Sequence, residues 1–280
     1  INSHRLLVRG HRVTAPENLK RIRVVADATR IEPILIAPLL AVPLLLLLLI
    51  GLLVSGRKRK QNEDAAWFDE KRGVFVVADG MGGHQAGEVA SALAARTLCE
   101  TLRDMQPSAD ALTRGYLAAN SAVFARQKEE ETLSGMGTTM TALWEDQEYV
   151  FVGQIGDSRA YLYRDGKLHQ ITEDQSMVGE MLRAGAITEE QARSHPYRNV
   201  ITQAVGTEER LTPVVTRILK TPGDVWLLCS DGLTDMARDE EIAAVLAECP
   251  AESAAEELVR LALQHGGTDN VSVLLLEVKA

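Results

Sequence analysis

Four aspartates adjoin apolar stretches of the 280-residue chain, at points where each stretch ends or begins. They are Asp79 after VFVVA, Asp157 after YVFVGQIG, Asp231 after VWLLCS, and Asp269 before VSVLLLEV. If these stretches are buried strands that end on one rim of a sheet, four carboxylates converge there, which is costly unless cations lie between them. A site with only oxygen ligands selects hard ions, Mg²⁺ or Mn²⁺, over zinc.

The first aspartate opens a glycine-rich stretch, "DGMGGH", residues 79–84. Glycine at position 80 lets the backbone approach closely, so the carbonyl of Gly80 is a candidate further ligand. A nucleotide-binding cradle would need a Walker lysine or a GxGxxG motif, and the stretch has neither. Any single Asp-Gly pair is more simply explained as a turn. Four such acids at strand ends favour a shared metal site.

A basic and acidic segment, "GRKRKQNED", residues 56–64, supplies complementary groups. Arg59 can hold a phosphate through two parallel hydrogen bonds, which a lysine cannot do. Glu63 and Asp64 can hydrogen-bond waters on a metal ion. The alternative for residues 57–60 is a basic cluster that orients a neighbouring membrane segment, and the residues alone leave both interpretations open.

The elements that must position these acids alternate between strand and helix patterns after Gly73. Strands grouped in hairpins, with pairs of helices between the groups, indicate an α+β layered fold rather than a βαβ repeat. Asp165-Gly166 is a strong hairpin signal. We expect helices at about 85–105, 108–130, 239–247 and 251–265, helical patterns over 173–194, and strands over 137–171 and near 199–205, 213–219, 224–229 and 271–278.

Charge is distributed unevenly along the chain. Residues 1–60 carry a net charge of +8 and residues 61–280 a net charge of −17. An acidic body argues against binding to nucleic acid, since that requires neutralising phosphates. The three cysteines, at positions 99, 229 and 249, show no metal-binding or disulfide spacing and are interpreted as reduced thiols.

Residues 34–54 carry no charge over 21 positions. This length suits a membrane-spanning helix, and the basic residues 57–60 that follow would place the C-terminal body in the cytoplasm, tethered to the inner face of the membrane. The alternative is that the end of the run is a buried strand. Residues 1–33 form a basic leader that we expect to be poorly ordered.

Taken together, these segments resemble the metal-dependent serine/threonine protein phosphatases of the PP2C (PPM) type, in their compact bacterial form. The resemblance covers residues 52–280 almost without a break, and the order of the motifs makes it specific. The matching stretches are GRKRKQNED, VVADGMGGHQAGEVAS, GMGTTMTAL, GDSRAYLYRDGKL, ITEDQSMV, GAITEEQARSHPYRNVITQAVG, GDVWLLCSDGLTD and GGTDNVSVLLLEV.

The resemblance implies an α-β-β-α sandwich with a central antiparallel β-sandwich, and hydrolysis of phosphoserine and phosphothreonine by a water that bridges two Mn²⁺ or Mg²⁺ ions. It implies phosphorylated proteins as partners, including serine/threonine kinases and their substrates, and no nucleic acid. By position, the resemblance implies that Asp79 bridges both ions and that Gly80 binds one of them through its carbonyl. It implies that Asp231 and Asp269 complete the other site, and that Asp157 binds a third, weaker metal. It further implies that Arg59 binds phosphate, that Asp64 acts through a metal-bound water, and that Glu63 and Asn270 support the centre.

Two points depart from the resemblance, and one rival function stays open. Met81 stands where eukaryotic relatives have a histidine that is proposed as general acid, so the proton donor is unassigned. Residues 173–198 match a mobile flap. The family's first strand would use about Leu49–Ser55, which a helix over 34–54 would consume. A non-catalytic binding module with the same fold is the main rival function, although it would be expected to have lost ligand acids.

Overall fold

The end of the apolar run is a strand. In the computed structural model, which describes residues 7–8, 11–12, 24–26, 47–57, 59, 61–82 and 85–279, Leu47–Val54 forms β4. This strand pairs along its whole length with the last strand of the chain, β14 (Val271–Val278). A helix over all of 34–54 is incompatible with this pairing, and the remainder of the run lies outside the described residues. No helix in the described ranges is long and apolar enough to cross a membrane.

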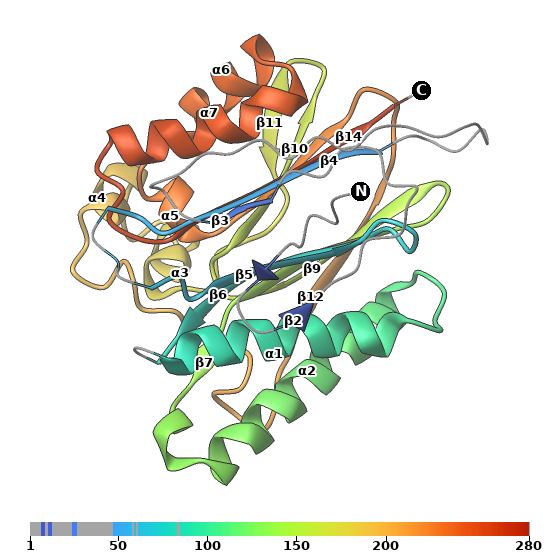
Figure 1. Ribbon diagram of the computed structural model, residues 1–280. Coiled ribbons are helices and arrows are strands. Elements are labelled where there is room, and N and C mark those ends of the chain that lie inside the picture. Colours follow the sequence, from blue (N-terminus) through green and yellow to red (C-terminus); the bar gives the residue numbers. More distant parts are fainter. Residues whose placement is uncertain are drawn as a thin grey trace.

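Two six-stranded sheets form the centre of the structure (Figure 1). All their pairings are antiparallel except that of β3 with β4. The first sheet has the order β11 (Lys167–Gln170), β10 (Arg159–Arg164), β13 (Val225–Cys229), β14, β4, β3 (Val24–Ala26). The second has the order β12 (Val214–Leu219), β9 (Tyr149–Ile155), β8 (Met140–Glu145), β6 (Val74–Met81), β5 (Asp64–Asp69), with β7 (Gly137–Thr138) beside β6.

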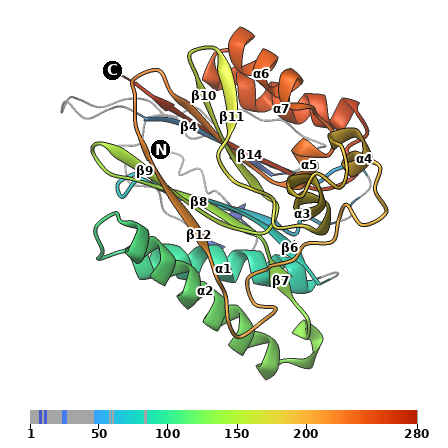
Figure 2. The same ribbon diagram turned by 180° about the vertical axis from the view of Figure 1, so that it is seen from behind.

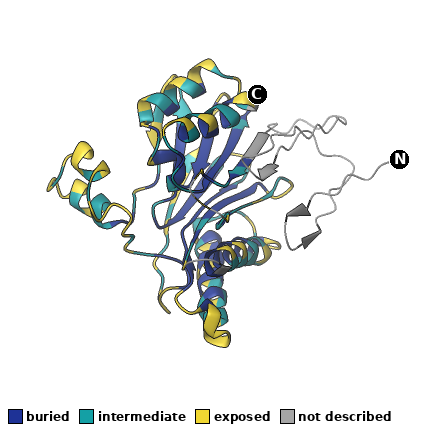
Figure 3. Ribbon diagram, turned by 60° about the vertical axis from the view of Figure 1, so that its left-hand side comes forward, coloured by how far each residue is buried: buried dark blue, intermediate teal, exposed yellow. Residues whose placement is uncertain are grey.

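Helices cover the outer face of each sheet, which gives four layers, as expected (Figures 1 and 3). Helices α1 (Gln85–Leu102) and α2 (Ala109–Glu129) cover the second sheet. Helices α6 (Asp239–Glu248) and α7 (Ala251–Gln264) cover the first. The remaining elements are β1 (Leu7–Val8), β2 (His11–Arg12), η1 (Glu131–Leu133), α3 (Met177–Arg183), α4 (Glu189–Arg193) and α5 (Asp231–Thr234).

Strand β6 shows why the central strands are apolar at nearly every position. Side chains of a strand alternate between its two faces, and both faces are covered here. Val74 and Val76 pack into the core beneath α1 and α2, whereas Phe75 and Val77 pack into the core between the sheets. The first polar residue of β6, Asp79, therefore marks the point where the strand leaves these two cores.

Two local predictions need correction. The predicted strand over 199–205 is absent, because Ile201 and Val205 each form an isolated bridge with a different partner, Ser176 and Thr138. The helical pattern over 173–194 is two short helices, α3 and α4. The hairpin at Asp165-Gly166 is confirmed, with both residues at positive φ.

The turn after β5 offers a test of how pH affects the stability of the fold. Burial, aided by the charge of Asp69, raises the pKa of Glu70 to about 7. The folded state therefore holds this proton more tightly than the unfolded state, so stability falls as pH rises from about 4.5 to 7. Glu70→Gln should raise the free energy of unfolding at pH 8 by about 1 kcal/mol, or Tm by about 2 °C, with the full shift discounted for partial exposure.

The gain from Glu70→Gln should vanish near pH 4, where both states hold the proton. Glu148→Gln, at an exposed position in the turn between β8 and β9, is the matched control and should leave the Tm unchanged at either pH. Thermal unfolding at the two pH values measures both variants. Equal gains for Glu70→Gln at pH 4 and pH 8 would contradict the assigned protonation.

Candidate metal centre

The four aspartates lie next to strands of both sheets, at one end of the sandwich. Asp79 lies near the C-terminal end of β6, and Asp157 follows β9 in the second sheet. In the first sheet, Asp231 begins α5 directly after β13, and Asp269 lies just before β14. After burial, the charges of Asp231 and Asp157 raise the pKa of Asp79, and those of Asp157 and Asp269 raise the pKa of Asp231, so the acids share one neighbourhood.

Asp64 lies opposite Asp79 in the ladder between β5 and β6. Its Oδ2 accepts hydrogen bonds from the hydroxyls of Ser230, at 2.9 Å, and Ser272, at 2.5 Å. Its Oδ1 is buried and has no partner among the described residues. Burial is the main cause that raises the pKa of Asp64 to about 6, and the two serine hydroxyls oppose that rise. The Asp64 carboxyl thus has one buried oxygen that could accept a hydrogen bond or bind a cation.

Asp79 and Asp231 approach each other from opposite sheets. Burial, together with the charges of neighbouring acids, raises the pKa of both well above the ordinary value. The Oδ1 of Asp231 is also buried without a partner in the described part of the chain. Neighbouring carboxylates that share one buried site cannot all ionise unless positive charge joins them.

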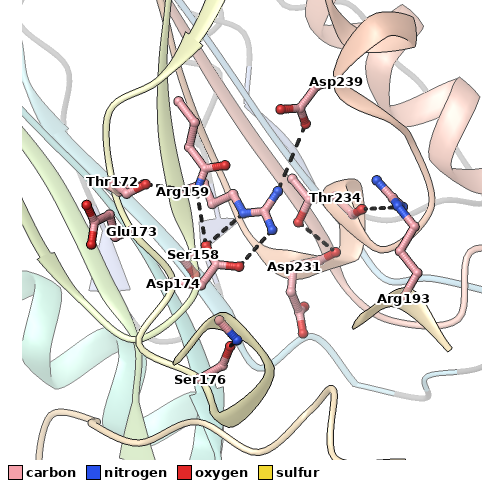
Figure 4. Close-up of polar contacts among 12 residues, drawn as sticks. Ser158, Arg159, Thr172, Glu173, Asp174, Ser176, Arg193, Asp231, Thr234 and Asp239 are labelled. Atoms are coloured by element: carbon pink, nitrogen blue, oxygen red, sulfur yellow. Dashed lines mark hydrogen bonds and ion pairs between the residues drawn. The ribbon is translucent and has the colours of Figure 1, made fainter. Parts of the chain in front are cut away.

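Asp157 lies beside a second group of acids that the sequence did not identify. Burial, and next the charge of Asp174, raise the pKa of Asp157 to about 7. Figure 4 shows Arg159 bound to Asp174 through two nitrogens, at 2.8 and 2.7 Å, with Asp239 farther off at 4.0 Å. Asp235, one helical turn after Asp231, also raises the pKa of Asp157. Its i, i+4 spacing from Asp231 is the signal that could have identified it.

Arg59 contacts an acid of the cluster directly. Its Nη2 lies 2.7 Å from Oδ2 of Asp269, and its Nη1 lies 4.0 Å from Oε2 of Glu63. The hydrogen bond to Asp269 raises the pKa of the guanidinium. The Arg59 side chain remains 48% exposed, so a ligand at the end of the sandwich can reach it.

Asn270 and Gly80 hold the loop that carries Arg59 and Asp64. The Oδ1 of Asn270 accepts the backbone N–H of Glu63 at 2.9 Å, and its Nδ2 donates to the carbonyl of Gln61 at 3.0 Å. The N–H of Gly80 donates to the carbonyl of Glu63 at 3.1 Å. A Cβ at position 80 would lie 2.1 Å from the carbonyl oxygen of Gly87, so only glycine fits between this loop and α1.

The donor set fits hard divalent cations. Buried carboxylate oxygens without partners, among acids that repel one another, are the ligands that Mg²⁺ and Mn²⁺ prefer. Within the described ranges, however, no three His, Cys, Asp or Glu side chains are already gathered around one point. Asp269 instead pairs with Arg59.

The flap matched in the sequence, residues 173–198, projects from the sandwich next to this cluster. Figure 3 shows α3 and α4 as largely exposed helices apart from the four layers. Neither helix buries a residue fully. The Oγ of Ser176 caps α3, and the N–H of Thr202 donates to the carbonyl of Gln175 at 2.7 Å, which ties the base of the flap together.

Comparison with curated proteins finds bacterial phosphatases. The chain is 42% identical over 226 residues to the serine/threonine protein phosphatase PstP of Mycobacterium tuberculosis, a match that covers 80% of this chain and 43% of that protein. It is 36% identical over 232 residues to the serine/threonine phosphatase stp of Listeria innocua, covering 79% and 92%. The chain thus spans less than half the length of the mycobacterial protein.

Solved structures give the same result. The crystal structure of the M. tuberculosis phosphatase PstP/Ppp matches with a TM-score of 0.78 and 39% identity, covering 84% of this chain and 99% of that one. Stp1 from Staphylococcus aureus matches with a TM-score of 0.79 and 33% identity, covering 84% and 96%. A PstP catalytic domain solved with two manganese ions matches with a TM-score of 0.76 and 38% identity, covering 84% and 99%. The profile of protein phosphatase 2C matches residues 56–266, and the chain belongs to that family.

Proposed function

We propose that this chain hydrolyses phosphoserine and phosphothreonine in proteins with the help of two Mn²⁺ or Mg²⁺ ions. One observation carries the proposal: acids from both sheets gather at one end of the sandwich with Arg59 at its rim, and two of their buried oxygens have no partner among the described residues. When bound, the two metal ions would lower the pKa of a water that bridges them, so that hydroxide is available near neutral pH. The PstP catalytic domain solved with two manganese ions supports the same cofactor here.

Each residue has a stated part in this proposal. Asp79 and the carbonyl of Gly80 would hold the ions from the second sheet, and Asp231 and Asp269 would hold them from the first. Asp157 would hold a third ion. Asp64, fixed by Ser230 and Ser272, would hydrogen-bond a metal-bound water through the oxygen that has no partner among the described residues.

Arg59 binds the phosphate once Asp269 turns to the cation. The planar guanidinium then pairs with two phosphate oxygens and stabilises their charge during the transfer. Glu63 and Asn270 act on the centre indirectly, since they hold the loop that carries Arg59 and Asp64.

A cysteine-based phosphatase is the rival chemistry that the structure argues against. Cys229, two residues before Asp231, is fully buried, and burial raises the pKa of its thiol to about 12. The thiolate is the nucleophile in such enzymes, so this group is inert. Its side chain packs in the core beneath α6 and α7.

Serine/threonine kinases and their substrates are the proposed partners. The relatives' names describe serine/threonine phosphatases, and phosphorylated serine or threonine side chains are the products of such kinases. Cytoplasmic placement of the catalytic domain, with tethering through residues 34–54, stays a prediction from the sequence.

Removal of the metal tests the proposal. The chain should release phosphate from a phosphothreonine peptide in the presence of Mn²⁺, lose this activity in EDTA, and regain it when Mn²⁺ exceeds the chelator. A phosphate-release assay on one protein preparation covers all three conditions. A peptide that binds but is not hydrolysed with either Mn²⁺ or Mg²⁺ would instead identify the chain as a binding module.

A further inference from the structure

A cavity of about 360 Å³ lies at one edge of the sandwich, apart from the aspartate cluster. Its walls are the edge strand β12, the neighbouring β9, the segment after β11, and α3 at the base of the flap, and Figure 2 shows these elements on one side of the molecule. β12 is the last strand of its sheet. The cavity therefore opens along a sheet edge, where an extended chain has room to lie.

The inner wall of this edge cavity is hydrogen-bonded to the backbone next to the proposed metal centre. Gln154 and Gln175, both buried, line it. The N–H of Gly156 donates to Oε1 of Gln175 at 2.8 Å, and Nε2 of Gln154 donates to the carbonyl of Gly156 at 3.0 Å. Gly156 directly precedes Asp157, so a group bound in the edge cavity lies one short backbone segment away from the acids.

The edge cavity combines apolar and polar surface with one unpaired carboxylate. Ile171 and Val214 supply the apolar part, and threonine and glutamine side chains line much of the rest. Arg183, the one cation among the described residues that line the cavity, is already engaged by Glu173 at 3.6 Å and by the carbonyl of Asp174 at 2.8 Å. The carboxylate of Glu180 lines the same cavity and has no hydrogen bond or ion pair to another described residue.

This combination suits a long cationic side chain. Lysine and arginine lay their methylene stems along apolar surface and keep the charged head at a polar group. An anionic group would meet Glu180 and a cation that is already paired. The body of the chain, with a net charge of −17, adds a field of the same sign as Glu180.

We propose that the edge cavity binds a lysine or arginine side chain of the phosphoprotein substrate, three to five residues from the phosphorylated residue; this rests on the proposed phosphatase function. Residues 152–154 precede Asp157 by three to five positions, which is at most about 10–17 Å, because the chain leaves β9 after Ile155. An extended substrate segment covers that distance with the same number of residues. Glu180 is then a specificity-determining residue, and the flap base is part of the substrate site.

Phosphothreonine peptides with a single lysine, placed three, four or five residues before or after the phosphothreonine, test this proposal. Each is compared with the same peptide carrying glutamine. At least one lysine register should lower KM about two- to fivefold at unchanged kcat, the size expected of a solvent-exposed ion pair. Glu180→Gln should remove that preference. Glu189→Gln, on the adjacent flap helix α4 and outside the edge cavity, should keep it.

Two further measurements separate this inference from the proposed function. Hydrolysis of p-nitrophenyl phosphate, which has no flanking residues, reports on the metal centre alone and should be the same for wild type and Glu180→Gln. If it proceeds while lysine and glutamine peptides are equivalent in every register, or while Glu189→Gln loses the preference equally, the edge-cavity proposal is wrong and the phosphatase proposal stands. If no phosphate ester is hydrolysed, fluorescence anisotropy of labelled peptides still decides: tighter binding of a lysine peptide that depends on Glu180 supports the inference, and equal binding overturns it.

Discussion

Asp79→Asn is expected to abolish Mn²⁺-dependent hydrolysis of p-nitrophenyl phosphate, with a fall of about a thousandfold or more. Asp79 stands between the acids of the two sheets, opposite Asp64 in the β5–β6 ladder and close to Asp231. Its loss removes the carboxylate that would face both ions, and metal activation of water contributes several kcal/mol to such reactions. Isothermal titration with Mn²⁺ should show weaker binding together with the lost rate.

The same substitution should leave the fold intact. Burial and neighbouring charges raise the pKa of Asp79, so its ionised form destabilises the protein without a cation, and asparagine removes that cost. Tm measured without added metal should therefore equal or exceed that of the wild type. Asp165→Asn is the matched control, because Asp165 also precedes a glycine but lies in the β10–β11 hairpin at positive φ, which asparagine tolerates. A wild-type rate and Mn²⁺ affinity in Asp79→Asn would remove Asp79 from the ligand set.

The gathering of the acids could be predicted from the sequence for a physical reason. A strand buried on both faces has no place for a carboxylate until the backbone leaves the core, so an aspartate after an apolar run marks a strand end. Asp79, Asp157 and Asp231 each follow this rule, and Asp269 mirrors it at the start of β14. That all four ends lie together depends on sheet order, which the resemblance implied and local patterns did not.

Other features depend on tertiary partners that no local pattern reveals. The stretch LLLIGLLV has the composition of a membrane helix, yet it forms β4 because β14 offers eight residues of matching ladder. Residues 199–205 have the apolar content of a strand, but Ile201 and Val205 meet two different partners, so no ladder forms. The pairing of Arg159 with Asp174 joins a strand to the base of the flap, across a sequence separation that carries no periodic signal.

Gly232→Ala should destabilise the protein by about 3 kcal/mol and lower Tm by about 10 °C, although residue 232 is no proposed ligand. A Cβ at this position would lie 1.8 Å from the carbonyl oxygen of Asn270, which is backbone and cannot rotate away. Gly232 follows Asp231, and Asn270 follows Asp269, so the close approach of these two segments holds the two first-sheet acids together. Forcing the segments apart should weaken Mn²⁺ binding in the folded fraction as well as the fold.

Gly115→Ala is the matched control for Gly232→Ala, because a Cβ at position 115 would meet only the flexible ends of Leu98 and Leu102, at 3.2 Å or more. It should keep both the Tm and the Mn²⁺ affinity of the wild type. Thermal unfolding and Mn²⁺ titration below the lowered Tm measure the two effects separately. If Gly232→Ala loses stability but binds Mn²⁺ as tightly as the wild type, the spacing of Asp231 and Asp269 does not matter to the ion. These two acids would then not share it, and the centre would have to be built around Asp79 and the second sheet alone.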